Sequence, residues 1–138
     1  RVGWGYGAKD IIDVLNSVRS PFNVSSLGLK MAELSVEDVN FVNEQRELNK
    51  VNREVLRNGL LDLGIMTDQS FANFLLLRFE SEKQANTIDL FLKEKGFILR
   101  KVSSYGLPKC LRLSIGNKEI CEKLYLTLAE YFDNNDRV

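Results

Sequence analysis

The sequence predicts an α/β fold in which a long helix leads into a compact sandwich, with helices covering one face of a β-sheet. Three observations support this. A chain of 138 residues with 44% apolar residues can form one globular domain, or a small domain with part of a neighbour. Residues 37–63 contain no proline and repeat apolar side chains at helical intervals. Beyond Gly64 short strand patterns alternate with helical ones.

The first 36 residues predict one strand and two helices. Residues 1–7 alternate bulky side chains with glycine, which is typical of a strand with its large residues on one face. Residues 8–18 and 25–34 have a helical apolar period, and the segment 20–23 separates them because its proline disfavours helix. The chain has no initiator methionine and no secretory leader, so we expect a truncated reading frame or an excised fragment.

The longest helical pattern occupies residues 37–63. Ser35 and Asp38 resemble a capping box at its start, and Gly64 is a plausible stop. Its middle, residues 43–52, is too polar for a helix buried on all sides. We therefore expect a surface helix that connects two bodies.

The remaining residues predict the order strand, strand, helix, strand, strand, helix. The second of these strands is almost continuously apolar, so we expect it at the centre of the sheet. The expected elements are strands at 65–67 and 73–79, a helix at 85–95, strands at 97–101 and 111–115, and a helix at 118–132.

Charge and residue counts exclude several classes of function. Nineteen basic and nineteen acidic residues give zero net charge, so no positive excess favours nucleic acid or an anionic membrane surface. No apolar run approaches the roughly 20 residues that a membrane helix needs. The sequence has no histidine, which removes histidine-dependent triads, histidine-bearing zinc sites and imidazole chemistry. Cys110 and Cys121 do not form a zinc motif; free thiols in a reducing cytoplasm are expected, with a disulfide as the alternative.

Two arginines are candidates for binding an anion. A period of two along the strand 111–115 places Arg112 and Ser114 on the face opposite to its leucines, and Arg100 lies on the neighbouring segment. A guanidinium grips a carboxylate or phosphate with two parallel hydrogen bonds, so two of them on adjacent strands would form an anion site. The alternative is that each arginine lies on a solvated sheet face or pairs with a local glutamate.

Arg1 and Tyr105 are ambiguous in the same way. Arg1 either binds an anion or is simply a charge at the end of the chain. Tyr105 belongs to a turn at 105–108 and either lines a site or covers the edge of the sheet. The glycines among the first seven residues lack the spacing of a phosphate-binding loop. From the residues alone, the chain is an α/β protein with a candidate anion site.

Four stretches together resemble the histidinol-phosphate aminotransferases, which are class I/II pyridoxal-phosphate-dependent aminotransferases. Their order and spacing agree along the chain to about Phe132. The stretches are Arg1-Val2-Gly3-Trp4-Gly5, Arg19-Ser20-Pro21-Phe22-Asn23-Val24-Ser25, Ala72-Asn73-Phe74, and Tyr105-Gly106-Leu107-Pro108 running into Leu111-Arg112-Leu113-Ser114-Ile115-Gly116.

This resemblance implies the C-terminal part of a fold type I enzyme. Residues 1–36 would be the end of the large pyridoxal-phosphate-binding domain, and residues 37–63 the interdomain helix. Residues 64–133 would form the small α/β domain, followed by a tail at 134–138. The resemblance also implies a cytoplasmic homodimer in the full-length form, acting in histidine biosynthesis.

The resemblance assigns roles to three arginines. Arg1 aligns with the arginine that contacts the cofactor phosphate, while Arg112 and Arg100 align with residues that bind the substrate's acidic group. The expected reaction converts histidinol phosphate and 2-oxoglutarate to imidazole acetol phosphate and glutamate, with pyridoxal 5'-phosphate as cofactor. The Schiff-base lysine would lie upstream, so this chain holds no catalytic lysine and is expected to be inactive alone. Lys109 and Cys110 depart from the family pattern, which bears on substrate specificity.

Alternatives remain open at this point. An aromatic-amino-acid aminotransferase or a threonine-phosphate decarboxylase would share the fold and the arginine. A non-catalytic binding or assembly module, in which the arginines are structural, is the alternative from another class. A fully exposed, carboxylate-paired Arg112 with no concavity beside Arg100 would favour that module.

Overall fold

The computed structural model describes residues 2–135. The chain forms two compact units, residues Arg1–Glu44 and Gln45–Val138, and each is described by itself. Within the described residues, no helix is long and apolar enough to cross a membrane.

The first unit contains two helices, α1 (Lys9–Val18) and α2 (Ser26–Glu37), as the apolar periods predict. Ser25 caps α2, because its Oγ accepts a hydrogen bond from the Gly28 backbone N–H at 3.1 Å. Between the helices, Phe22 has a positive φ of 56°, which confirms the break around the proline. Neither helix has a buried residue within this chain.

The strand expected at residues 1–7 is wrong for the described part of that segment. Residues 2–8 form no regular secondary structure. A strand is held by backbone hydrogen bonds to a neighbouring strand, and the four strands of the sheet pair only with one another. Alternation of bulky side chains with glycine is therefore not enough to predict a strand. Arg1 lies outside the described residues.

The long helix is α3 (Val39–Asp62), close to the expected bounds. Its cap differs from the expectation, since Ser35 lies within α2 and its Oγ donates to the Met31 carbonyl at 2.7 Å. Because α2 continues to Glu37, the capping oxygen comes from Asp38, which accepts from the Phe41 N–H at 3.1 Å. Gly64, with φ of 76°, follows the end of the helix as expected.

The second unit has the expected order of strands and helices. The sheet order is β1-β2-β4-β3 and every neighbouring pair is antiparallel, so the apolar strand β2 is central as predicted. The expected strand at 97–101 is shorter, because only its last two residues pair with β4. The elements are β1 (Met66–Thr67), β2 (Phe74–Arg78), α4 (Glu82–Glu94), β3 (Arg100–Lys101), the 3₁₀ turn η1 (Ser103–Tyr105), β4 (Cys110–Ser114) and α5 (Lys118–Asn135).

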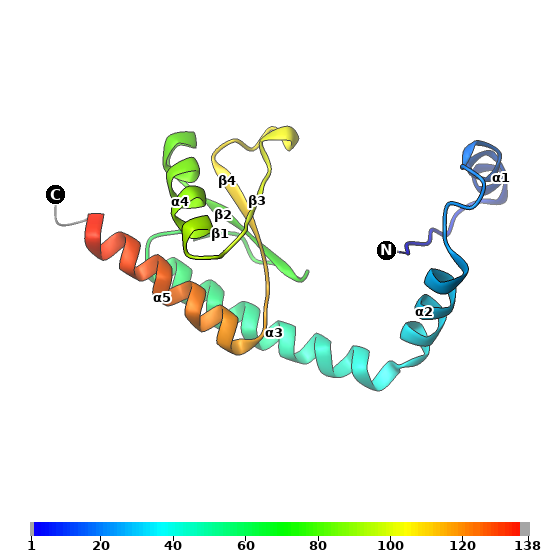
Figure 1. The fold of residues 1–138 in the computed structure, drawn as a ribbon, viewed down its shortest axis with the longest axis horizontal. Coiled ribbons are helices and arrows are strands. Elements are labelled where there is room, and N and C mark those ends of the chain that lie inside the picture. Colours follow the sequence, from blue (N-terminus) through cyan, green and yellow to red (C-terminus); the bar gives the residue numbers. More distant parts are fainter. Residues whose placement is uncertain (1, 136–138) are drawn as a thin grey trace. The chain divides into compact units, whose positions relative to one another are not determined.

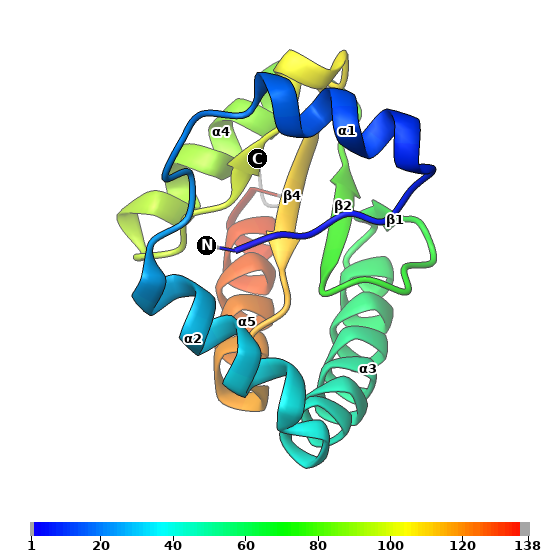
Figure 2. The ribbon, with the colours of Figure 1, turned by 90° about the vertical axis from the view of Figure 1, so that its right-hand side faces the viewer.

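The core lies between the sheet and the helices of this unit, which cover one face of the sheet (Figures 1 and 2). Alternate residues of β2 and β4 point into it, as a period of two requires. Both cysteines are buried and free, which confirms the expectation of free thiols. The central core residues are Leu56, Leu60, Leu75, Leu77, Ile88, Leu92, Leu111, Leu113, Leu124 and Leu128.

Candidate anion-binding site

The register of the sheet brings the two predicted arginines together. Arg100 on β3 pairs directly with Arg112 on β4, which in turn pairs with Leu76 on β2. Directly opposite residues of an antiparallel pair share a face, with Cβ atoms about 4.5–5.5 Å apart. This is the face opposite to the core, since Arg112 alternates with the buried leucines of β4. The two arginines are therefore neighbours by their Cα atoms, while the Arg112 guanidinium lies against Phe74 and the Arg100 guanidinium against Tyr105.

Neither arginine has an acidic partner within the described residues. The ion pairs of the described chain involve other side chains, and Arg112 Nε is buried without a hydrogen-bond acceptor. Like charges directly opposite each other destabilise a sheet, and an unsatisfied buried donor costs about 1–3 kcal/mol. A bound anion would offset the repulsion between the two like charges. The local-glutamate alternative for Arg112 is thus contradicted by the described structure.

An aromatic ring positions Arg112. The guanidinium carbon of Arg112 lies 5.2 Å from the centroid of the Phe74 ring, within the range of a cation–π contact. Phe74 is the first residue of β2, one strand away from Arg112 in the sheet. The Arg112 guanidinium is therefore in contact with an aromatic ring of the neighbouring strand β2.

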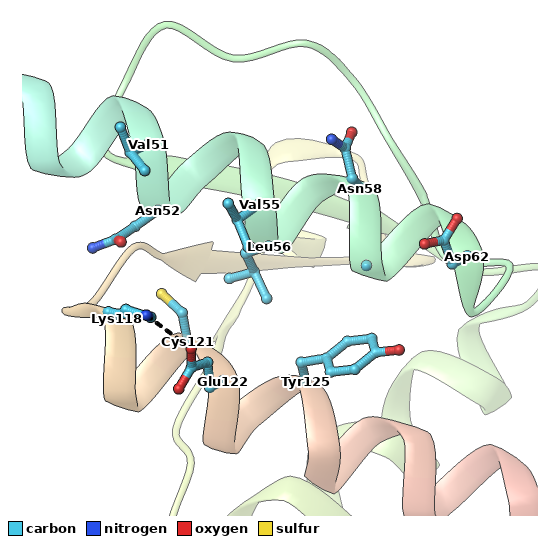
Figure 3. A pocket seen from close by; sticks show the side chains of 11 residues that line it. Val51, Asn52, Val55, Leu56, Asn58, Asp62, Lys118, Cys121, Glu122 and Tyr125 are labelled. Carbon is cyan, nitrogen blue, oxygen red and sulfur yellow. Dashed lines mark ion pairs between the residues drawn. The ribbon is translucent and has the colours of Figure 1, made fainter.

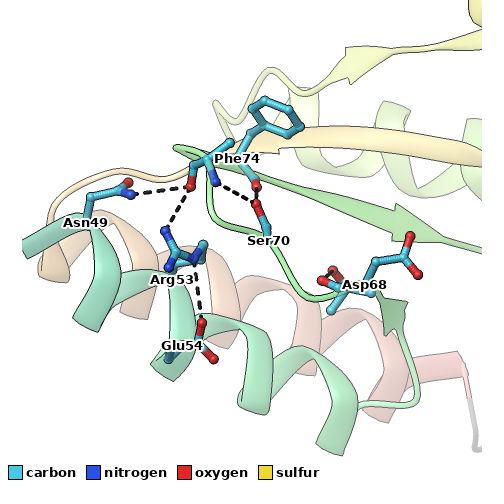
Figure 4. A network of polar contacts seen from close by, with 8 residues as sticks. Asn49, Arg53, Glu54, Asp68, Ser70 and Phe74 are labelled. Atoms are coloured by element: carbon cyan, nitrogen blue, oxygen red, sulfur yellow. Dashed lines mark hydrogen bonds and ion pairs between the residues drawn. The ribbon is translucent and has the colours of Figure 1, made fainter. Parts of the chain in front are cut away.

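Helix α3 in turn holds the segment that leads to Phe74 (Figure 4). The Ala72 carbonyl accepts hydrogen bonds from Arg53 Nη1 at 3.0 Å and from Asn49 Nδ2 at 3.4 Å. Ser70 Oγ donates to the Phe74 carbonyl at 2.7 Å. Sequence reasoning missed Arg53, which is only 6% exposed. Its place in the apolar stripe of α3, three residues before Leu56, was the available signal.

Arg100 is held differently, by Tyr105. Its Nη2 donates to the Tyr105 hydroxyl at 2.8 Å, and its guanidinium carbon lies 5.6 Å from the ring centroid. Gly106, with φ of 76°, ends the turn that presents this tyrosine. Both roles considered for Tyr105 are consistent with this contact, because Arg100 lies on the edge strand β3.

A third arginine on this face, Arg78, is already paired. Asp68 Oδ2 accepts from Arg78 Nη2 at 2.6 Å and from Nε at 3.0 Å. The hydrogen bond and charge of Asp68 raise the pKa of Arg78 above its ordinary value. Arg78 lies on the same strand face as Leu76 but has its own counter-ion. It is thus a matched comparison for Arg100 and Arg112.

Two cavities of the second unit lie elsewhere. One, of about 580 Å³, lies between α3 and α5 and is lined by Val51, Val55, Cys121 and Tyr125 among others (Figure 3). Burial raises the pKa of the Cys121 thiol. The other, of about 170 Å³, lies between the core and the start of α5. Neither of these two cavities is lined by Arg100 or Arg112, so neither supplies a concavity beside Arg100.

Comparisons with known proteins agree with the resemblance in the sequence. The family model "Aminotransferase class I and II" matches residues 1–127. A histidinol-phosphate aminotransferase of Jannaschia sp. (strain CCS1) is 49% identical over 129 residues, which cover 94% of this chain and 36% of the relative. One of Ruegeria sp. (strain TM1040) is 44% identical over 131 residues, covering 95% of this chain and 36% of the relative. The chain thus spans about a third of the length of these curated relatives.

Solved structures of the same enzyme class have a similar fold. The solved histidinol-phosphate aminotransferase of Sinorhizobium meliloti, in complex with pyridoxal-5'-phosphate, matches with a TM-score of 0.78. That match covers 88% of this chain and 34% of the solved chain at 19% identity, so it bears on the fold alone. It confirms the expectation of part of a fold type I aminotransferase. The chain belongs to the class I and II aminotransferase family.

Proposed function

We propose that this chain supplies the substrate-anion site of a pyridoxal-phosphate-dependent aminotransferase that acts on histidinol phosphate and 2-oxoglutarate. Family membership and the function named for relatives at 49% and 44% identity support the enzyme class and the substrate. One observation carries the assignment of the site: Arg100 and Arg112 are in direct register, and neither is neutralised by a carboxylate of the described chain.

The roles of the two arginines follow from their donors. The Arg112 fork suits the carboxylate of glutamate and the phosphate of histidinol phosphate, because both present paired anionic oxygens. Arg100 adds a second positive charge on the same face. One site can therefore hold two substrates in turn, as alternate half-reactions of amino transfer require.

The cofactor would be held mainly outside the described residues. Pyridoxal 5'-phosphate, when bound, supplies the electron sink for the reaction. We propose Arg1 for its phosphate, as the resemblance implies, and a lysine upstream of this chain for its attachment. Arg112 Nε is one of three buried arginine Nε atoms without an acceptor in the described chain, together with those of Arg53 and Arg57, so the assignment of Arg112 to the substrate rests on its register with Arg100. The described residues accordingly bind and orient the substrate.

We propose the domain organisation, assembly and location on the same basis. Residues 1–36 would complete the large domain, and residues 37–63 would form the helix that connects the two domains. Residues 64–133 would form the small domain, followed by a tail at residues 134–138. The complete core of the second unit and the crossing of α3 between the two units support this organisation. The enzyme would be a cytoplasmic homodimer with small-molecule substrates and no nucleic acid or membrane partner.

A chimeric enzyme tests the proposal. The matching segment of the Jannaschia enzyme is replaced by this chain, and transamination of histidinol phosphate is measured. We expect activity, and in Arg112→Gln we expect kcat/KM to fall about 30- to 1,000-fold, the range for losing a charge-assisted bidentate contact worth roughly 2–4 kcal/mol. Arg78→Gln is the matched control, because this arginine already has Asp68 as a partner. It should change kcat/KM by less than about twofold.

Three outcomes would contradict the proposal. Equal kcat/KM in Arg112→Gln and Arg78→Gln would remove Arg112 from the site and favour the non-catalytic module. A preference of the chimera for aromatic amino acids would favour the aromatic-amino-acid aminotransferase. Release of carbon dioxide from threonine phosphate would favour the decarboxylase.

A further inference from the structure

We infer that Tyr105 makes the Arg100–Arg112 site selective for phosphate over carboxylate ligands. This inference rests on the proposed function, since it assumes that the two arginines bind the substrate anion. It concerns a residue whose hydroxyl and ring both contact Arg100.

The Tyr105 hydroxyl has a hydrogen available for a ligand. A phenol has one donor hydrogen and two acceptor lone pairs. Its oxygen accepts from Arg100 Nη2 at 2.8 Å, so this contact leaves the hydroxyl hydrogen unused. In the part of the chain that the structure describes, no acceptor takes that hydrogen. The hydroxyl therefore adds a neutral donor beside the positive charge of Arg100.

The turn holds Tyr105 in place before any ligand arrives. The Tyr105 backbone N–H donates to the Val102 carbonyl at 3.0 Å, and Gly106 N–H donates to the Ser103 carbonyl at 3.0 Å. Val102 is only 5% exposed and anchors the turn. The Tyr105 side chain itself is 63% exposed, so it can be changed with little effect on folding.

The number of acceptor oxygens on the ligand is the basis of the inferred selectivity for phosphate over carboxylate. A carboxylate has two oxygens, and the Arg112 fork can engage both. A phosphate group has at least one further oxygen, which remains for the donors around Arg100. Arg100 is the nearest strand neighbour of Arg112, and the Tyr105 hydroxyl contacts Arg100, so we infer that this hydroxyl is among the donors that the further oxygen meets. Loss of the hydroxyl should therefore weaken phosphate binding more than carboxylate binding.

Titration of the full 138-residue chain tests this inference. Inorganic phosphate and acetate are added separately at constant ionic strength, and dissociation constants are obtained from NMR shifts of the arginine side-chain N–H groups. In Tyr105→Phe, which keeps the ring, we expect phosphate binding to weaken about three- to tenfold, the effect of one hydrogen bond to a charged ligand at an exposed position. Acetate binding should change less than about twofold. Ser103→Ala, in the same turn, should change neither.

The outcomes separate the two proposals. Equal weakening of both ligands in Tyr105→Phe, or no weakening of phosphate, would overturn the selectivity while leaving the arginine site intact. Unchanged binding of both ligands in Arg112→Gln, or no binding by the unmodified chain, would overturn the proposed site and the inference with it. A loss confined to phosphate in Tyr105→Phe, with both ligands lost in Arg112→Gln, is the supporting result.

Discussion

Replacing Gly59 by alanine tests the packing of α3 against α5. Gly59 lies inside α3 at the wall of the larger cavity, where the Tyr125 ring approaches the helix backbone. A Cβ atom at this position would lie 2.9 Å from Tyr125 Cδ2 and 3.0 Å from Cε2. These separations are too short for carbon atoms in contact, whose favourable distance is about 3.5–4.0 Å.

Two effects of opposite sign determine how much Gly59→Ala changes the free energy of unfolding. Alanine is better than glycine in a helix interior by about 0.8–1.0 kcal/mol. Forcing an extra carbon into a packed contact costs about 1–3 kcal/mol. The collision involves one edge of the rigid Tyr125 ring, so the ring must move as a whole. We therefore expect Gly59→Ala to lower the free energy of unfolding by about 1 kcal/mol.

Urea unfolding of a double-mutant cycle measures the collision directly. In a Tyr125→Ala background only the helix preference remains, so Gly59→Ala should raise the free energy of unfolding by about 1 kcal/mol. Asn58→Ala, at the exposed neighbouring position, should raise the free energy of unfolding both in the unmodified chain and in Tyr125→Ala. If Gly59→Ala stabilises the unmodified chain as much as it stabilises Tyr125→Ala, the close contact between the helices does not exist in solution.

Three further predictions concern single residues. Arg53→Met should lower the free energy of unfolding in urea by about 1–3 kcal/mol, because a buried donor to the Ala72 carbonyl is lost; an unchanged midpoint would contradict this. Phe74→Leu should weaken acetate and phosphate binding alike, about two- to fivefold, since the cation–π contact with Arg112 is worth about 0.5–1 kcal/mol; NMR titration would show a ligand-dependent loss if this is wrong. Because burial raises the Cys121 pKa, the folded chain retains a proton that the unfolded chain loses. The stability that this proton contributes is present below the unfolded pKa and is lost as pH rises through the folded pKa. As pH rises above the ordinary thiol pKa of roughly 8.5, the free energy of unfolding should therefore fall more steeply in the unmodified chain than in Cys121→Ala, and parallel pH profiles would refute it.

Elements whose signals are local could be predicted from the amino-acid sequence. The apolar periods of α1, α2 and α3, the glycine after α3, and the alternation that places Arg112 opposite to the leucines of β4 all agree with the structure. These features depend on helical or strand geometry within one segment, so neighbouring residues suffice to predict them. The family resemblance then added roles for the arginines that spacing alone left open.

Tertiary structure decided which segments meet. The sheet order and the register that pairs Arg100 with Arg112 depend on strands that are brought together only by folding. The contact between Tyr105 and Arg100 was likewise invisible in the spacing of residues. The spacing of Arg53 in α3 indicated its burial, but only the folded structure shows that it bonds the segment before β2. The expected strand at residues 1–7 failed for the same reason, because a strand forms only where another backbone accepts and donates its hydrogen bonds.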